Sequence, residues 1–179
     1  MFEISPTPLD GLLSVTPLQR PDPRGRFVKL FHAPSFAAAG LCTDYREQYL
    51  TTSHRNVLRG MHFQTPPHDH AKLVYCLSGR VLDVALDLRR GSATFGLAFS
   101  AELDGDADQG LYIPRGFAHG FLTLSAEAAL HYFVETAHAP DHDTGVRWDS
   151  FGFDWPIQAP LISPRDAALP PWERRESPF

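Results

Sequence analysis

The chain has 179 residues, which is long enough for one hydrophobic core and too short to require two. Hydrophobic residues make up 43% of it, which excludes overall disorder, and a formal net charge of −5 argues against nucleic acid as the main partner, because that role usually needs a basic face. With no signal-peptide pattern at the start and no apolar run of about 20 residues, we expect a single domain, residues 1–179, in the cytoplasm and without a membrane partner.

Short strands joined by turns are predicted along the chain, because proline and glycine are scattered throughout and helical periodicity is scarce. Residues 11–15 are predicted as an edge strand, 21–25 as a turn, 27–31 as a strand, and 34–40 as a short helix ending at Gly40. Further strands are expected at 73–77, 80–88, 95–99, 110–113, 117–124 and 130–134, with turns at 78–79 and 114–116. A proline-rich tail from Pro156 should follow the surface. The prediction is an all-β, antiparallel sandwich or barrel.

The most informative segment is residues 59–64, Arg-Gly-Met-His-Phe-Gln, followed by Lys72 ten residues after His62. In a strand, His62 and Gln64 project to the same face. An imidazole can remove a proton next to a carbonyl group, and a fixed ammonium can stabilise the oxyanion that forms. The cluster therefore favours proton abstraction, although a lone histidine is more often structural and Arg59 and Lys72 alone could be solvated surface charges.

Residues 114–119, Pro-x-Gly-x-x-His, resemble the second sequence motif of the cupin barrels, whose histidine is a ligand in the metal-binding members. Counting back from Gly79, the glutamate of the first cupin motif falls on Lys72, and one of its histidines on His68. A protonated ammonium cannot ligate a divalent metal, so we expect the barrel without its metal site. A metal-dependent cupin enzyme, such as a dioxygenase, remains the alternative, with these ligands: His68, His70 and His119.

Six segments carry a wider resemblance: 22–27, 56–64, 72–74, 83–89, 113–121 and 163–166. On these segments the chain resembles the dTDP-4-dehydrorhamnose 3,5-epimerases, a metal-free branch of the cupin superfamily that builds nucleotide-activated deoxysugars. The resemblance runs from about Asp22 to Pro170. It implies a cupin, jelly-roll antiparallel β-barrel with a few short helices, a nucleotide-sugar substrate, no cofactor and a homodimer.

The resemblance also implies roles for individual residues. His62 matches the general base, Asp166 the carboxylate that orients it, Tyr132 the general acid across the sugar ring, and Lys72 the group beside the C4 carbonyl. Without the resemblance, Asp166 would be an ordinary loop aspartate and Tyr132 a barrel-lining aromatic. The remaining implied substrate contacts, of which Arg24 comes from the neighbouring subunit, are Arg24, Phe27, Lys29, Gln48, Arg59, Gln64, His119, Asp143 and Arg165. The implied reaction inverts C3, C5 or both of a nucleotide-linked 4-keto-6-deoxyhexose.

Departures from the family pattern concentrate in the nucleotide-binding half. Lys29 replaces a glutamate, residues 49–50 (Tyr-Leu) replace Asp-Asn, and residues 137–138 (Ala-His) replace a tyrosine pair. Two exchanges are milder: Asp143 replaces a glutamate and Arg165 replaces a lysine. They predict that the nucleotide or the sugar differs from dTDP-4-keto-6-deoxyglucose, with CDP-linked deoxysugars and antibiotic sugars as candidates. Two other functions stay open: a non-catalytic cupin that binds sugar nucleotides, and a ketoisomerase, whose relatives lack the Arg-Gly-x-His-x-Gln run.

Overall fold

Antiparallel strands make up most of the molecule. The computed structural model describes residues 1–173 and 177–179, which form thirteen strands and two short helices. The strands are β1 (Phe2–Pro6), β2 (Leu13–Pro17), β3 (Gln19–Asp22), β4 (Gly25–Val28), β5 (Glu47–His54), β6 (Leu58–Gln64), β7 (Lys72–Ser78), β8 (Arg80–Asp87), β9 (Ala98–Asp104), β10 (Gly110–Ile113), β11 (Phe117–Thr123), β12 (Glu127–Val134) and β13 (Asp143–Gly145). The helices are α1 (Ala33–Ala38) and α2 (Pro164–Ala167), and neither is long or apolar enough to cross a membrane.

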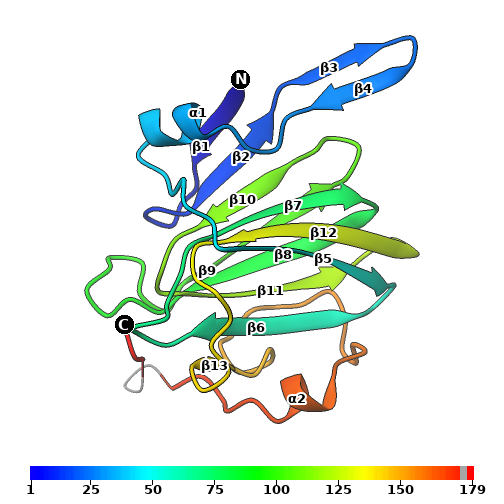
Figure 1. The fold of residues 1–179 in the computed structure, drawn as a ribbon. Coiled ribbons are helices and arrows are strands. Elements are labelled where there is room, and N and C mark those ends of the chain that lie inside the picture. Colours follow the sequence, from blue (N-terminus) through cyan, green and yellow to red (C-terminus); the bar gives the residue numbers. More distant parts are fainter. Residues whose placement is uncertain (174–176) are drawn as a thin grey trace.

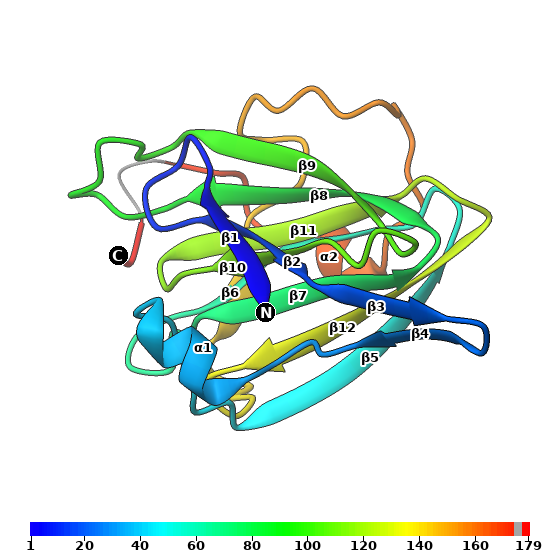
Figure 2. The same cartoon turned by 90° about the horizontal axis from the view of Figure 1, so that it is seen from above.

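Two sheets lie face to face (Figure 1). The larger has the order β1-β2-β10-β7-β12-β5 and the smaller the order β13-β6-β11-β8-β9, while β3 and β4 form a separate hairpin. That hairpin projects from the sheets as an arm at the upper right of Figure 1, and in the view from above it is drawn in front of β12 and β5 (Figure 2). The arrangement confirms the predicted all-β antiparallel fold, and the strands of largely apolar sequence, such as residues 73–77 and 80–88, were anticipated closely.

Three apolar clusters hold these layers together. The first joins both sheets across their shared interior, with Val74 and Leu130 from the larger sheet and Val81 and Phe121 from the smaller. The second covers the outer face of the smaller sheet with the C-terminal segment, and the third covers the outer face of the larger sheet with the region around α1. Full burial of each large apolar side chain contributes about 1.5–3 kcal/mol, so both outer layers stabilise the barrel walls.

The sequence prediction was wrong about three strands. The strand expected at 27–31 ends at Val28, because Phe31 turns away to pack edge-on against the rings of Phe36 and Tyr45. The strand expected at 95–99 begins only at Ala98, since residues 92–97 form consecutive hydrogen-bonded turns. The edge strand expected at 11–15 is β2 at 13–17, and it lies inside the sheet because β1 occupies the edge.

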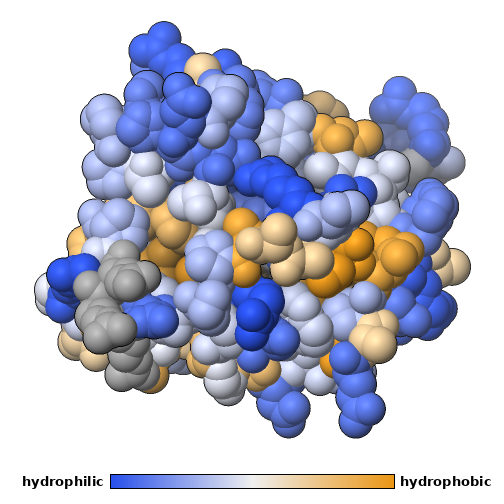
Figure 3. Space-filling view, turned by 90° about the horizontal axis from the view of Figure 1, so that it is seen from below, coloured by the Kyte–Doolittle hydropathy of each residue, from blue (hydrophilic) through white to orange (hydrophobic). Residues whose placement is uncertain are grey.

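The proline-rich tail follows the surface as expected, although its residues 174–176 lie outside the described residues. It contributes α2 and sends apolar side chains such as Ile157 and Trp172 against the smaller sheet. Seen from below, apolar patches alternate with hydrophilic side chains on this side of the molecule (Figure 3). The tail therefore does more than cover the barrel, because it places α2 beside β6.

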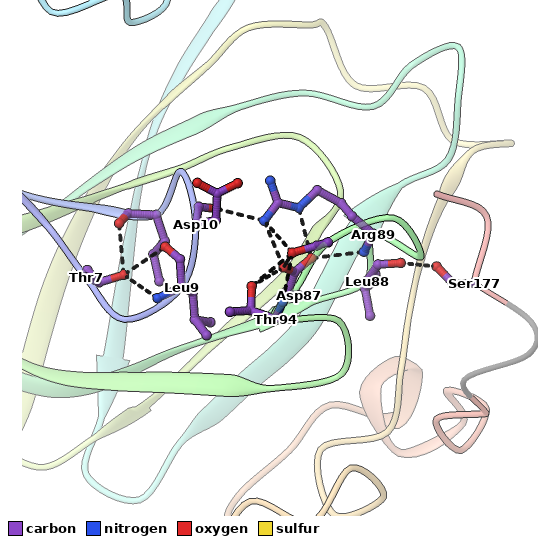
Figure 4. Close-up of polar contacts among 10 residues, drawn as sticks. Thr7, Leu9, Asp10, Asp87, Leu88, Arg89, Thr94 and Ser177 are labelled. Carbon is purple, nitrogen blue, oxygen red and sulfur yellow. Dashed lines mark hydrogen bonds and ion pairs between the residues drawn. The ribbon is translucent and has the colours of Figure 1, made fainter.

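A buried carboxylate, Asp87, holds together the loop that follows β8, and neighbouring residues of this loop contact residue 10 and the C-terminal tail (Figure 4). It accepts hydrogen bonds from the backbone and guanidinium of Arg89 and from the hydroxyls of Ser92 and Thr94. Arg89 also donates to the carbonyl of Asp10 at 2.7 Å, and Ser177 in the tail donates to the carbonyl of Leu88. Burial opposes ionisation of Asp87, but these hydrogen bonds outweigh it and hold the pKa of the carboxyl below its ordinary value.

Replacing Asp87 with alanine should lower the free energy of unfolding by about 3 kcal/mol, because Arg89 would lose its buried counter-charge. Denaturant titration of the variant measures this loss. Asp44→Ala is the matched control, since the ion pair of Asp44 with Arg46 is exposed on both sides and is worth less than about 1 kcal/mol. Equal small losses in both variants would contradict the role given to Asp87.

Candidate active site

A cavity of about 390 Å³ lies between the two sheets. Strands of both sheets contribute to its walls, so side chains from opposite walls face a common space. Its lining residues are Glu47, Tyr49, Thr51, Arg59, His62, Phe63, Gln64, His70, Lys72, His119, Gly120, Phe121, Tyr132, Val134, Thr136, His138, Asp143 and Arg165.

His62 on β6 forms a hydrogen-bonded pair with Asp166 on α2, with 2.7 Å between Nε2 and Oδ1. The second carboxylate oxygen accepts from the backbone N–H of Gly60 at 3.1 Å, and Ser163 caps the helix by accepting from the N–H of Asp166. Burial would raise the pKa of Asp166, but the hydrogen bonds and charge of His62 and the other donors lower it below its ordinary value. An ionised Asp166 can only accept, so Nε2 of His62 carries the proton of this hydrogen bond, and in the neutral ring the lone pair lies on Nδ1.

Two glycines bring β6 and β11 together beside His62. A Cβ atom on Gly60 would lie 2.5 Å from the Cα of Gly120, and one on Gly120 would lie 2.7 Å from the carbonyl oxygen of Arg59. Gly60 also has a φ of +130°, which side chains rarely allow. The strand register shifts at this point, and His62 becomes the direct cross-strand partner of His119.

Tyr132 on β12 enters the cavity from the opposite sheet. Its ring stacks on Tyr49, with centroids 4.7 Å apart, and meets His119 edge-on at 6.0 Å. His119 is itself held by Asp83, whose two carboxylate oxygens each lie 2.9 Å from Nε2. Burial, with Asp83 nearby, raises the pKa of Tyr132 well above its ordinary value, so the phenol stays protonated and can act as a proton donor.

Lys72, the first residue of β7, places its ammonium inside the cavity wall. The side chain is buried, and Nζ donates to the backbone carbonyl of His62 at 3.1 Å. Burial lowers the pKa of Lys72 to about 8, while the charges of Asp143 and Asp83 oppose the fall. At neutral pH the ammonium persists close to the histidine, in surroundings where a cation is costly and interacts strongly with a developing anion.

Cations also mark both ends of the cavity. Arg59 is held by the hydroxyl of Ser53 at 2.9 Å and by the carbonyl of Thr52 at 3.1 Å. Arg165 pairs with Asp143 at 2.7 Å near the other end. Both guanidinium groups are held by these contacts, and a guanidinium group can bind phosphate oxygens through two parallel hydrogen bonds.

The structure brings nine of the thirteen predicted site residues to this cavity or its wall: His62, Asp166, Tyr132, Lys72, Arg59, Gln64, His119, Asp143 and Arg165. The other four, Arg24, Phe27, Lys29 and Gln48, do not line it. Arg24 and Phe27 lie exposed on the β3–β4 arm, and Gln48 points out of β5 because alternate residues of a strand face opposite sides. Within this subunit these four residues therefore make no part of the cavity wall.

Several lining residues were missed as site residues by the sequence reasoning. Glu47 and Thr51 share the inner face of β5 with Tyr49, and Thr136 and His138 follow β12 at the cavity's end. Residues 47, 49 and 51 have the period-two spacing of a strand. They are polar, however, so the sequence lacks the apolar alternation that would have predicted a strand here. His70 was considered only as a metal ligand, and among the described residues no group of three His, Cys, Asp or Glu side chains is placed to hold a metal ion.

Fold and cavity together define a cupin-type enzyme for proton transfer next to a carbonyl group. A sequence model of the dTDP-4-dehydrorhamnose 3,5-epimerases matches residues 6–174. The chain belongs to this family.

Relatives of known name agree with this membership. The chain is 39% identical to a dTDP-4-dehydrorhamnose 3-epimerase of Streptomyces niveus, over 92% of this chain and 81% of the relative. It is 38% identical to the dTDP-4-dehydrorhamnose 3,5-epimerase of Escherichia coli, over 91% of this chain and 90% of that one.

Solved structures of epimerases are also similar to this chain, in both fold and sequence. A 4-keto-6-deoxy sugar epimerase from the novobiocin gene cluster of Streptomyces spheroides superposes with a TM-score of 0.91 at 37% identity, covering 96% of this chain and 87% of that one. The epimerase of Legionella pneumophila, solved with dTDP-4-keto-L-rhamnose, superposes with a TM-score of 0.89 at 32% identity, covering 97% of this chain and all (100%) of that one.

Proposed function

We propose that this protein is an isomerase that inverts C3, C5 or both of a dTDP-linked 4-keto-6-deoxyhexose in deoxysugar biosynthesis. The observation that carries the proposal is the position of His62 and Tyr132 on opposite sheets of one cavity, with Lys72 in its wall. Inversion requires that a proton leave one face of the sugar ring and that another arrive on the opposite face. A base and an acid on facing walls meet this requirement.

In the proposed reaction, Nδ1 of His62 takes the proton from the carbon next to the C4 ketone. Asp166 stabilises the imidazolium that results. The electron pair of the C–H bond moves towards the ketone oxygen, where the ammonium of Lys72 stabilises the enolate. The hydroxyl of Tyr132 then delivers a proton to the opposite face of the carbon. Solvent afterwards restores the proton of the phenol and takes up the proton that the imidazolium of His62 carries. Arginine side chains bind the diphosphate and supply binding energy remote from the reacting carbon.

Tyr132→Phe should slow epimerisation about 100-fold while exchange of the sugar C–H with deuterated solvent continues. The first deprotonation survives because His62 and Lys72 are unchanged, and only the return of a proton on the second face is lost. Proton NMR of the sugar nucleotide in deuterated buffer measures both rates in one sample. Parallel loss of exchange and epimerisation would contradict an acid role that is separate from the base.

The nucleotide is tested by comparing turnover of dTDP-linked and CDP-linked 4-keto sugars. The relatives named above act, by name, on dTDP sugars. Tyr49 and His138, which depart from the family pattern, line the cavity, whereas Lys29 does not. Family membership supports dTDP, and a clear preference for the CDP-linked sugar would instead favour the altered specificity that the sequence predicts.

Two rival functions predict different measurements. A non-catalytic sugar-binding cupin predicts affinity for the nucleotide sugar without solvent exchange at its C–H groups, although a hydrogen-bonded His62–Asp166 pair has no evident use in a binder. A metal-dependent cupin predicts stoichiometric metal in the purified protein. His119, one of its three ligands, instead directs Nε2 at Asp83. Metal analysis of the isolated protein distinguishes that rival from the epimerase.

The proposal includes a single domain over residues 1–179, a homodimer and a cytoplasmic location. The dimer is supported by the arm, since the side chain of Phe27 is 63% exposed and Arg24 does not line the cavity of its own subunit. A second subunit could bring these residues to the cavity from outside. Sedimentation equilibrium tests this: a dimer is expected, and a monomer at working concentration would contradict it.

A further inference from the structure

Tyr132 stands in a row of side chains that crosses the larger sheet. It pairs in register with Val74 on β7 and with Tyr49 on β5. Directly opposite residues of antiparallel strands project to the same face of a sheet, and Tyr49 and Tyr132 both line the cavity. Val74 is fully buried in the apolar cluster that also contains Tyr132. The ring of the acid therefore has the packed interior on its β7 side and Tyr49 on its β5 side.

The contact between the two tyrosine rings is a close, nearly parallel stack, with centroids 4.7 Å apart and planes inclined by 17°. Neighbouring strands are about 4.7–4.9 Å apart, so each ring stands over its own strand beside the other. Among the residues that the structure describes, β5 is the last strand of this sheet, which makes Tyr49 the outermost ring of the row. Tyr49 is 42% exposed and Tyr132 only 5%, so Tyr49 shields the acid from solvent.

The direction of the Tyr132 ring decides where the phenol delivers its proton. The oxygen lies on the axis from Cβ through the ring, so a swing of this axis about χ1 displaces the hydroxyl. The ring of Tyr49 blocks a swing towards β5. His119 meets the Tyr132 ring edge-on from the facing sheet, and Thr51, two residues after Tyr49, is within reach of the hydroxyl. Neither of them replaces the stacked ring on the β5 side.

We infer that Tyr49 is the positioning residue of the acid: its ring holds the phenol of Tyr132 towards the sugar carbon and keeps water from one face of it. The stack requires an aromatic ring and no hydroxyl. Burial is the largest cause of the raised pKa of Tyr132, and the covering ring contributes to that burial. The inference rests on the proposed function and adds a residue to its second proton transfer.

Tyr49→Ala should slow epimerisation about tenfold, while exchange of the sugar C–H with deuterated solvent stays within about twofold of the wild-type rate. Deprotonation continues because His62 and Lys72 are unchanged, whereas a phenol that swings towards β5 returns its proton less often. Tyr49→Phe restores the stacked ring and should recover most of the loss. Proton NMR of the sugar nucleotide in deuterated buffer measures both rates.

Phe151→Ala is the matched control, because it removes a ring that stacks on Phe153 outside the cavity, with centroids 6.1 Å apart. It should change neither rate. Unchanged epimerisation in Tyr49→Ala, or an equal loss of exchange and epimerisation, would overturn the inference. A Tyr49→Phe variant as slow as Tyr49→Ala would also overturn it, because the hydroxyl and not the ring would then be the group that acts.

A second test needs no substrate. A ring flip of Tyr132 requires space beside the ring, so aromatic NMR should show flips about tenfold or more faster in Tyr49→Ala than in the wild type or Tyr49→Phe. The Tyr132 signal is assigned by its loss in Tyr132→Phe. Equal flip rates in all three proteins would overturn the support by Tyr49. If the wild type epimerised no sugar nucleotide, the proposed function would fail, and the flip rates would still decide whether Tyr49 holds the ring.

Discussion

His62→Ala is expected to slow epimerisation about 10³-fold or more and to abolish exchange of the sugar C–H with deuterated solvent. The imidazole of His62 lies in the cavity and is oriented by Asp166, with 2.7 Å between Nε2 and Oδ1. Without it, the base assigned to the proton next to the ketone is lost. The affinity for the nucleotide should remain, because the arginines at the cavity ends are untouched. Exchange by NMR and affinity by calorimetry measure the two effects separately.

The matched control for His62 is His54→Ala, which removes an imidazole that is 82% exposed and lies outside the cavity. It should leave exchange and turnover near wild-type values. Residual exchange at a wild-type rate in His62→Ala would show that another group removes the proton. His119 would then be examined first, since it is the cross-strand partner of His62 in the same cavity.

Lys72→Met is expected to reduce kcat about 10²- to 10³-fold, because the enolate oxygen would lose the cation that stabilises it. Methionine has a similar length and no charge, so the wall of the cavity should stay filled. In the wild-type protein, kcat should fall as the pH rises through about 8, the pKa of the buried ammonium. A pH profile of kcat measures this, and the descending limb governed by Lys72 should be absent from the variant's residual activity.

The same substitution should raise stability. The fall in the pKa of Lys72 from 10.5 to about 8 corresponds to about 3 kcal/mol against the charged form in the folded protein. This penalty is fully present below about pH 8 and is relieved as the pH rises towards 10.5, where the unfolded chain also loses its proton. Lys72→Met should therefore be more stable at pH 7 by about 1 kcal/mol or more, and the advantage should shrink in alkali. Lower stability of the variant at pH 7 would indicate a structural role for Lys72.

The barrel strands were the predictable part of the fold. Strands β7, β8 and β11 carry apolar residues that fill the interior or the outer face of a sheet, and their pattern follows from burial. Strand β5 escaped prediction because its inward side chains at 47, 49 and 51 face a polar cavity instead of the core. The polar side chains that line the cavity therefore removed the apolar alternation by which β5 could have been predicted.

The residues of the candidate site could be predicted where they lie close together in the sequence, and could not be predicted where folding brings distant residues together. Residues 59–64 and Lys72 lie on neighbouring segments, so their chemistry could be recognised together. Asp166 stands 104 residues after His62, and its contact with His62 depends on the path of the tail that places α2 beside β6. Gln64 shows a different limit: its amide is bound by backbone groups that no sequence pattern identifies.

The central claim is that a base on one sheet removes the proton from the carbon next to the ketone, and that an acid on the facing sheet returns a proton to the opposite face of that carbon. Its most direct test is proton NMR of a dTDP-linked 4-keto-6-deoxyhexose in deuterated buffer with the wild-type protein and with His62→Ala. The wild type should place deuterium at C3, C5 or both and invert the labelled carbon, and His62→Ala should place none. Inversion without deuterium incorporation, or equal incorporation by both proteins, would contradict the account.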